Sequence, residues 1–207
     1  QRACETGPIS QLANRPTAEI AKQSGILNGA LVGLMWLLEI IDVALRGSLD
    51  WLGVHAWNFA MLWTLFTAPF AHQDFAHLAA NSIPLLVLGF FIALGGLRPW
   101  AYVTLAAAIG SGLFAFLLNA PGTVTIGASG IVFGYLTYLI VRGLFTRDWR
   151  DLVLGAVVLM VYGSVLWGVF PTAPGVSWQG HLGGAVAGLL IAWRLHSQDQ
   201  RRTTSNR

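Results

Sequence analysis

Long apolar runs alternate with short polar or proline-containing segments along most of this chain. Runs of about 20 apolar residues are long enough to cross the hydrocarbon core of a bilayer as helices. The breaks between them contain Pro99, Asn119–Gly122 and Pro171–Gly175, which are typical of turns. The pattern predicts six membrane-spanning helices, over Ile26–Leu45, His77–Leu97, Trp100–Leu118, Ile126–Phe145, Leu152–Phe170 and Trp178–Leu195.

Polar segments flank these runs, and one aromatic segment separates the first two. Residues 1–25 are predicted to form an N-terminal tail, residues 26–195 one six-helix domain, and residues 196–207 a basic C-terminal tail. The segment Gly47–Ala76 is too long for a tight turn. Its aromatic residues include Trp51, Trp57, Phe59, Trp63, Phe66 and Phe70. Because aromatic side chains favour the headgroup level, we expect an interfacial loop that anchors the bundle, borders the entrance of a site, or does both.

The composition places the chain in the membrane class. Hydrophobic residues make up 55% of the sequence and charged residues only 10%, whereas soluble domains carry about 25% charged residues. We therefore expect an all-α membrane protein whose surface faces the lipid bilayer.

The net charge of +3 comes from basic residues scattered at the ends of the runs, so nucleic acid is not an expected partner. Cys4 is the only cysteine, which excludes an intrachain disulfide and a cysteine metal cluster.

The basic residues also predict the orientation in the membrane. Six spans place both tails on one side, and eleven of the twelve lysine and arginine residues then fall on that side, with only Arg46 opposite. The positive-inside rule makes this side cytosolic. Lys22 is the only lysine, and such a preference for arginine is typical of GC-rich bacterial genomes. The sequence therefore predicts a bacterial plasma-membrane protein with both termini in the cytosol.

Two polar residues share one depth in this arrangement. Ser129 lies 13 residues before Arg142, and His181 lies 13 residues before Arg194, where each arginine ends an apolar run. At 1.5 Å per helical residue, both side chains lie about 20 Å from the cytosolic face. A serine nucleophile needs an adjacent base, and histidine is the commonest one. The pair predicts a nucleophile and a base inside the membrane, although either residue alone is also typical of helix packing.

Two further polar residues are expected on the same side of the membrane. The second, fourth and sixth spans all run from outside to inside, so their first halves face the exterior. His77 and Asn81 are four residues apart in the second span and therefore share a helix face. With the backbone N–H of Ser129, their side chains can donate hydrogen bonds to a developing oxyanion. Taken alone, Asn81 more often satisfies a neighbouring backbone carbonyl.

Small residues indicate how the fourth and sixth spans pack. Gly130 and Gly134 on one span, and Gly184 and Gly188 on the other, have the four-residue spacing that lets helix backbones approach closely. We therefore expect the two spans to lie face to face, which brings Ser129 toward the sixth span.

The remaining acidic residues and histidines give weaker signals. Asp42 and Arg46 have the i, i+4 spacing of an ion pair, and together with Glu39 they are expected to be solvated or interfacial. His72 and Asp74 are expected in a solvated turn rather than in a metal site. The apolar runs from the second onward contain no aspartate or glutamate. The sequence therefore favours a Ser-His dyad over a Ser-His-Asp triad, with no metal and no cofactor.

Three motifs together resemble the rhomboid family of intramembrane serine proteases. They are His77–Asn81, Gly127–Gly130 and His181–Gly188, in the family's order on the second, fourth and sixth spans. The resemblance covers about Trp57–Leu195 and therefore all spans except the first. It implies a six-transmembrane-helix rhomboid-like bundle.

The resemblance also implies a role for each site residue. Ser129 is similar to the family's nucleophile and His181 to its general base. His77, Asn81 and the backbone N–H of Ser129 would form the oxyanion hole. Phe133 occupies the position where the family has an aromatic ring stacked on the histidine.

The chain departs from the family pattern at a few positions. The family's Trp-Arg pair in the first outer loop is Trp63-Thr64 here. Ala93 lies near the place of a glutamate in the second span, and Pro84 is expected to interrupt that span. These departures concern the loop and the second span, and they leave the motif residues intact.

The predicted function is hydrolysis of peptide bonds in or near the transmembrane helices of membrane-protein substrates, at a site that opens to the outer face. Two alternatives remain: a catalytically inactive rhomboid-like scaffold that binds membrane helices, and a small channel or transporter. The intact Ser-His pair disfavours the scaffold. A transporter is expected to carry charges at the midplane or internal repeats, and the sequence shows neither.

Overall fold

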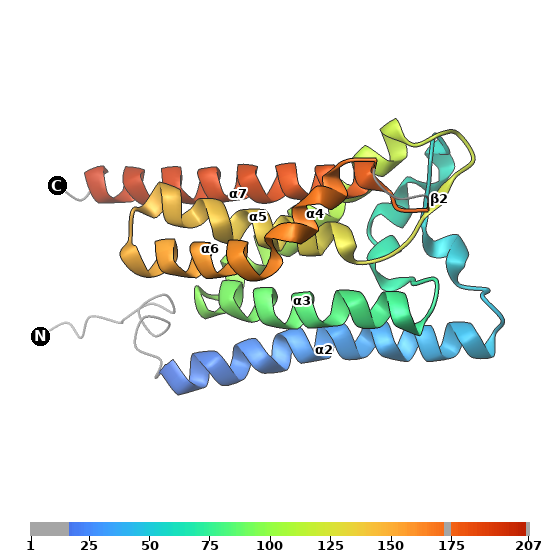
Figure 1. The fold of residues 1–207 in the computed structure, drawn as a ribbon, viewed down its shortest axis with the longest axis horizontal. Helices are drawn as coiled ribbons and strands as arrows, with labels where there is room; N and C mark the ends of the chain where they lie inside the picture. The colour runs from blue at the N-terminus through green and yellow to red at the C-terminus, as the bar shows by residue number, and fades with distance from the viewer. Residues whose placement is uncertain (1–16, 172–174, 206–207) are drawn as a thin grey trace, which may run out of the picture.

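The structure, a computed structural model, describes residues 17–171 and 175–205. Most of these residues lie in helices that run side by side (Figure 1). The long helices are α2 (Thr17–Ala44), α3 (Phe75–Leu94), α4 (Leu97–Leu118), α5 (Ser129–Thr146), α6 (Trp149–Tyr162) and α7 (Trp178–Ser205). The 3-10 helices are η1 (Asp50–Leu52), η2 (Phe59–Leu65), η3 (Ala68–Phe70) and η4 (Gly163–Val169). Two short strands, β1 (Val54–His55) and β2 (Val124–Thr125), pair in antiparallel orientation.

Most of the long helices are suited to a bilayer. In the described part of the chain, the segments long and apolar enough to cross a membrane are Ala18–Ala44, Phe75–Leu94, Leu97–Leu118, Ser129–Thr146 and Trp149–Val169. α7 does not meet this criterion, and its 28 residues continue into the polar C-terminal segment. Length and composition thus identify a helical membrane protein with five candidate spans, and this criterion does not confirm the predicted count of six.

The helix limits differ from the predicted ones near both ends of the chain. α2 begins at Thr17, inside the predicted N-terminal tail, and α7 continues to Ser205, through most of the predicted C-terminal tail. The start of α2 accepts polar residues because the Ser24 hydroxyl and the Asn28 amide donate to carbonyls one turn earlier, each at 2.8 Å. Residues 1–16 of the predicted tail lie outside the described residues.

Two spans differ from prediction in their interior. The fifth is α-helical only to Tyr162 and continues as η4 from Gly163, a residue with low helix propensity. α3 is continuous through Pro84, where the sequence predicted an interruption. Proline removes one N–H from a helix, and packing against neighbouring helices can retain the remaining hydrogen bonds.

α5 lies at the centre of the bundle. It contacts α3, α4, α6 and α7, whereas α2 packs mainly on α3 (Figure 1). The α5 side chains Tyr135, Leu136 and Leu139 are buried and belong to the main hydrophobic cluster. The start of α2 and the end of α7 lie at one end of the bundle, and β2 lies at the other end (Figure 1).

The predicted glycine contacts between α5 and α7 are confirmed. A Cβ atom on Gly184 would collide with the Gly130 carbonyl, and a Cβ atom on Gly188 would collide with the Gly134 carbonyl. The two backbones are therefore so close that only glycine fits between them. α4 makes a similar glycine contact with α7, which the sequence pattern did not indicate.

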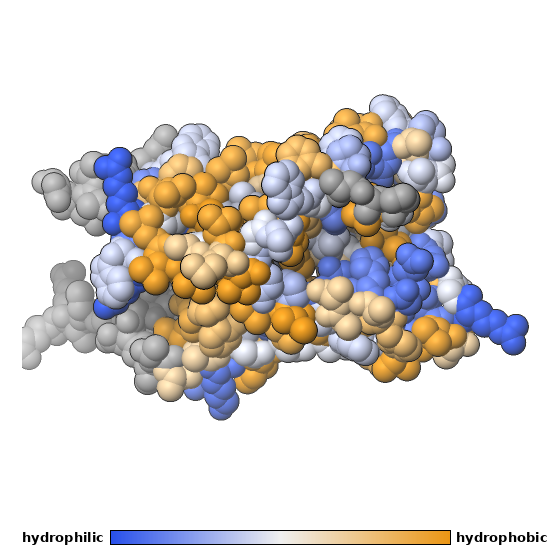
Figure 2. Space-filling model, in the orientation of Figure 1, coloured by the Kyte–Doolittle hydropathy of each residue, from blue (hydrophilic) through white to orange (hydrophobic). Residues whose placement is uncertain are grey.

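Large hydrophobic side chains cover the outside of the bundle. Leu37, Ile40, Met160 and Trp193 are all more than half exposed. Figure 2 shows hydrophobic residues over the helices and hydrophilic residues toward the two ends. Such an extended apolar surface is typical of contact with lipid.

The aromatic segment Gly47–Ala76 is folded rather than extended. It forms η1, β1, η2 and η3, and Trp57 within it donates from its ring N–H to the Asn119 carbonyl at 3.1 Å. Phe59 remains two-thirds exposed. Because β1 pairs with β2, this segment lies next to the start of α5.

Candidate functional site

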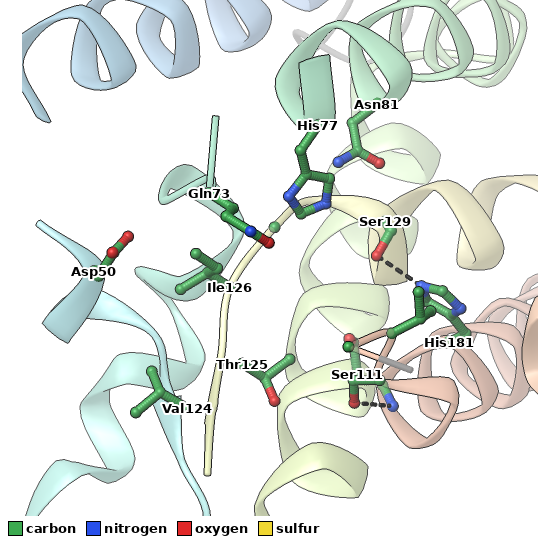
Figure 3. A pocket seen from close by; sticks show the side chains of 15 residues that line it. Asp50, Gln73, His77, Asn81, Ser111, Val124, Thr125, Ile126, Ser129 and His181 are labelled. Carbon is green, nitrogen blue, oxygen red and sulfur yellow. Dashed lines mark hydrogen bonds between the residues drawn. The ribbon is translucent and has the colours of Figure 1, made fainter. Parts of the chain in front are cut away.

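A cavity of about 490 Å³ opens beside the start of α5. The four side chains predicted for the site, those of Ser129, His181, His77 and Asn81, all line this cavity. They come from α5, α7 and α3, and Figure 3 shows His77 and Asn81 on one side of Ser129 and His181 on the other. The fold therefore brings together residues that lie far apart in the sequence.

Ser129 is the first residue of α5, and the turn before it depends on a glycine. Gly127 has a φ of +112°, and a Cβ atom there would collide with the His77 ring. The N–H of Gly127 donates to the Ala68 carbonyl at 3.0 Å. The predicted helix start at Ile126 is too early, because this turn precedes the helix. Since Ser129 opens α5, its own N–H has no acceptor within the helix.

The Ser129 hydroxyl and the His181 ring form a hydrogen bond. Ser129 Oγ lies 2.8 Å from His181 Nε2, and His181 Nδ1 lies 2.9 Å from the Gly168 carbonyl oxygen. A carbonyl can only accept, so Nδ1 carries the proton and Nε2 accepts from the hydroxyl. Phe133 stacks on the imidazole, with ring centroids 4.2 Å apart and an interplanar angle of 11°. These contacts fix the tautomer and the orientation of His181 without a carboxylate.

Asn81 and His77 face the cavity from the first turns of α3. The Asn81 side chain is buried, and its Nδ2 has no hydrogen-bond partner among the described residues. A Cβ atom on Gly127 would lie 3.8 Å from that Nδ2, which places the amide beside the turn that precedes Ser129. The Asp74 carboxylate accepts from the backbone N–H of His77 at 2.7 Å and caps α3. The Asn81 side-chain amide therefore presents its unused N–H donors to the cavity.

Several other groups at the cavity had no clear signal in the sequence. The Gly168 carbonyl is a backbone atom, which leaves no mark in a sequence pattern. Ser111 of α4 lines the cavity and packs directly on Gly130. Asp50 lies at the edge of the cavity, where desolvation and the nearby Asp42 carboxylate raise the pKa of its own carboxyl group.

The predicted solvated turn at His72 is wrong. His72 is only 1% exposed, and its Nε2 accepts from the backbone N–H of Ala128 at 3.4 Å. Burial, together with the nearby His77, lowers the pKa of His72 to about 4. Folding of the aromatic segment over the start of α5 buries this ring. The described residues contain no group of three or more histidine, cysteine or acidic side chains that could hold a metal ion.

The predicted solvated ion pair near the end of α2 is also wrong. Glu39 and Asp42 are buried, and the Asp42 carboxylate accepts from the backbone N–H of Leu49. The turn after α2 thus satisfies Asp42 locally, and no ion pair between Asp42 and Arg46 forms in the described part of the chain. The ion pair found in these residues joins Arg142 Nε to Asp151 at 3.1 Å, at the other end of the bundle.

The fold and the cavity together define a helical membrane protein with a serine and a histidine hydrogen-bonded inside the bundle. A sequence model of the Rhomboid domain matches residues 60–198, which is more than half of the chain. This chain belongs to the rhomboid family. The resemblance indicated by the three motifs is therefore confirmed.

Bacterial and plant proteins are similar to this chain. Uncharacterized protein Rv1337 of Mycobacterium tuberculosis is 41% identical over 202 residues, which cover 94% of this chain and 83% of that protein. Uncharacterized protein ML1171 of Mycobacterium leprae is 39% identical over 212 residues, covering 96% and 84%. Rhomboid-like protein 11, chloroplastic, of Arabidopsis thaliana is 29% identical over 153 residues, covering 67% and 54%.

Proposed function

We propose that this protein is an intramembrane serine protease that hydrolyses peptide bonds in or near the transmembrane helices of other membrane proteins. Membership of the rhomboid family supports this function. The observation that carries it is the 2.8 Å hydrogen bond from Ser129 Oγ to His181 Nε2, inside a cavity that also contains unpaired donors. This arrangement has the geometry of a nucleophile with its base.

In the proposed reaction, Ser129 Oγ attacks the carbonyl carbon of the scissile peptide bond, and His181 Nε2 takes the hydroxyl proton. The protonated imidazole is held by the Gly168 carbonyl and the Phe133 ring, which replace the orienting carboxylate of a triad. Collapse of the tetrahedral intermediate breaks the C–N bond. His181 then donates its proton to the leaving amine, and an acyl-enzyme on Ser129 remains.

The developing oxyanion needs donors that are already in place. We assign this role to Asn81 Nδ2, the ring N–H of His77 and the backbone N–H of Ser129. A buried amide without a partner lowers the stability of a protein, so its retention beside the nucleophile favours a function in the transition state. Water then attacks the acyl carbonyl with His181 as the base, which releases the second product and restores the serine.

The distribution of basic residues indicates the face of the membrane to which the cavity opens. The cavity lies toward the end of the bundle that carries β2, opposite the start of α2 and the end of α7 (Figure 1). With the basic residues at the cytosolic face, both termini are cytosolic and the cavity opens toward the outer face of a bacterial plasma membrane. The exposed aromatic residues of Gly47–Ala76 lie at the headgroup level, where a substrate helix leaves the lipid.

Probe labelling and substitution together test this function. In detergent-solubilised protein, a fluorophosphonate probe is expected to label the native chain but not Ser129→Ala, and neither Ser129→Ala nor His181→Ala should cleave a membrane-protein substrate. Ser24→Ala is the matched control, because Ser24 is a buried serine on α2 outside the cavity. Substantial cleavage by folded Ser129→Ala or His181→Ala would overturn the assignment. A native chain that binds membrane helices without labelling or cleavage would instead be a scaffold.

A further inference from the structure

We propose that His72 is a positioning residue for the nucleophile. It accepts the N–H of Ala128, the residue directly before Ser129, and thereby holds the turn that aims the serine hydroxyl into the cavity. This inference rests on the proposed protease activity. None of the motifs that indicate the family includes this histidine.

His72 is buried and accepts a backbone hydrogen bond. The ring is 1% exposed, Ala128 is fully buried, and the two are joined through His72 Nε2 at 3.4 Å. A backbone N–H can only donate, so Nε2 must be unprotonated and the proton must lie on Nδ1. The pKa of His72, lowered to about 4 by burial, keeps the ring neutral at physiological pH, so this acceptor is available.

One segment accepts hydrogen bonds from two consecutive backbone amides of the turn before Ser129. The Ala68 carbonyl accepts from Gly127 at 3.0 Å, and His72 accepts from Ala128 at 3.4 Å. The acceptors lie in η3 and in the turn that follows it, so this short stretch acts as a template for the start of α5. Ser129 is the next residue, and a displacement of the turn would move Oγ relative to His181. Displacements of about 1 Å can lower rates by about 100-fold.

His72 also contacts His77, one of the proposed oxyanion donors. The rings of His72 and His77 are edge to face, with centroids 5.2 Å apart and an interplanar angle of 68°. The His77 ring also occupies the space where a Cβ of Gly127 would lie. His72 therefore contacts both the turn before Ser129 and the His77 ring. His72 itself does not line the cavity.

The test compares two substitutions of similar size. His72→Gln keeps an acceptor oxygen in the side chain, whereas His72→Phe keeps the aromatic ring and removes the acceptor. We expect His72→Phe to lower kcat by about 10- to 100-fold with KM changed less than about twofold, because the loss affects alignment rather than binding. His72→Gln is expected to recover most of kcat. Thermal unfolding is measured for both variants to compare their stability.

Hydrogen exchange of backbone amides provides a readout that needs no activity. The Ala128 N–H is expected to exchange about 10-fold faster or more in His72→Phe than in the native chain, because it loses its acceptor. The Gly127 N–H, held by Ala68, is the internal control and should change less.

The outcomes separate this inference from the proposed function. Equal kcat in His72→Phe and His72→Gln would overturn the positioning role, and so would losses of kcat that simply follow unfolding temperature in both variants. If the native chain neither labels with fluorophosphonate nor cleaves, the protease proposal fails. The exchange rate of Ala128 then still decides whether His72 holds the turn.

Discussion

At the scale of single residues, the site contains a buried polar group that is expected to lower stability. The Asn81 amide is buried with an unpaired Nδ2 among the described residues, and such a group costs about 1–3 kcal/mol of folding free energy. Asn28 on α2 is also buried, but its amide donates to the Ser24 carbonyl and accepts from Trp100 at 3.1 Å. The Asn28 amide is therefore satisfied by its neighbours, whereas the Asn81 Nδ2 is not.

This contrast gives a paired prediction. Asn81→Ala is expected to lower turnover by about 10²–10³-fold, the loss seen for one oxyanion donor, without lowering the free energy of unfolding. Asn28→Ala is expected to lower the free energy of unfolding by about 1–3 kcal/mol and to leave turnover near native. Kinetics with a transmembrane substrate and unfolding in a detergent micelle measure both. Destabilised but fully active Asn81→Ala would make Asn81 a packing residue.

The stability of the protein is expected to depend on pH through His72. The pKa of His72 falls from 6.5 to about 4 on folding, so above pH 6.5 the ring is neutral in both states. Between pH 6.5 and 4 the unfolded chain binds a proton that the folded chain does not bind, so stability falls as pH falls, by up to about 3 kcal/mol. The His77 ring lies against this ring, and the Asp74 carboxylate lies close to His77, so the measurement is the difference in the free energy of unfolding between the native chain and His72→Gln. If the difference in stability between the native chain and His72→Gln stays the same from pH 7 to pH 4.5, the lowered pKa of His72 is contradicted.

At the scale of helices, glycine sets the distance between α5 and α7. α5 carries the serine and α7 the histidine, so the 2.8 Å hydrogen bond between them depends on how closely the helices pack. Gly184 packs on the Gly130 backbone, one residue after Ser129 in the chain. Helix packing and the alignment of Ser129 with His181 therefore depend on the same contacts.

Alanine substitution at two glycines tests this dependence. Gly184→Ala is expected to lower the free energy of unfolding by about 1–3 kcal/mol, since its Cβ would meet the Gly130 backbone, and to lower activity by separating the dyad. On α2, a Cβ added to Gly33 would have no atom within 4 Å, so Gly33→Ala should raise stability by about 0.5–1 kcal/mol. Unfolding curves and turnover of both variants provide the measurement. Native stability and native turnover of Gly184→Ala would show that α5 and α7 can move apart without loss of either.

At the scale of the whole molecule, the arrangement of the ends predicts its topology. The start of α2 and the end of α7 lie at one end of the bundle, and the cavity lies toward the other (Figure 1). The positive-inside rule assigns the first end to the cytosol. A protease of this orientation would act on substrates from the outer leaflet.

Cysteine labelling in intact cells tests this topology. In a Cys4→Ser background, Gly175→Cys beside the cavity should react with a membrane-impermeant maleimide, whereas Ser205→Cys at the end of α7 should react only after the cells are opened. A permeant maleimide is the control for reactivity at both positions. Labelling of Ser205→Cys alone in intact cells would reverse the orientation.

Hydrophobic patterning and short motifs are enough to predict most of the helices and the polar residues that line the cavity. Hydrophobic runs predict helices because each span must satisfy its own backbone hydrogen bonds in lipid, and glycines at four-residue spacing predict close packing of α5 and α7. The motif residues Ser129, His181, His77 and Asn81 all line one cavity. Helix ends are predicted less well: α2 begins at Thr17, before its apolar run, and the Ser24 hydroxyl there donates to the Ile20 carbonyl.

Which groups surround these residues depends on how the helices and loops pack. The Gly168 carbonyl on His181 is a backbone atom and has no sequence signal. The sequence predicts solvated positions for His72 and Glu39, yet both are buried in the folded chain. Burial of a polar side chain depends on contacts between remote elements rather than on its neighbours in sequence. The pattern of residues therefore determines where the helices form and which polar side chains they carry, and the packing of those helices determines how those side chains are aligned.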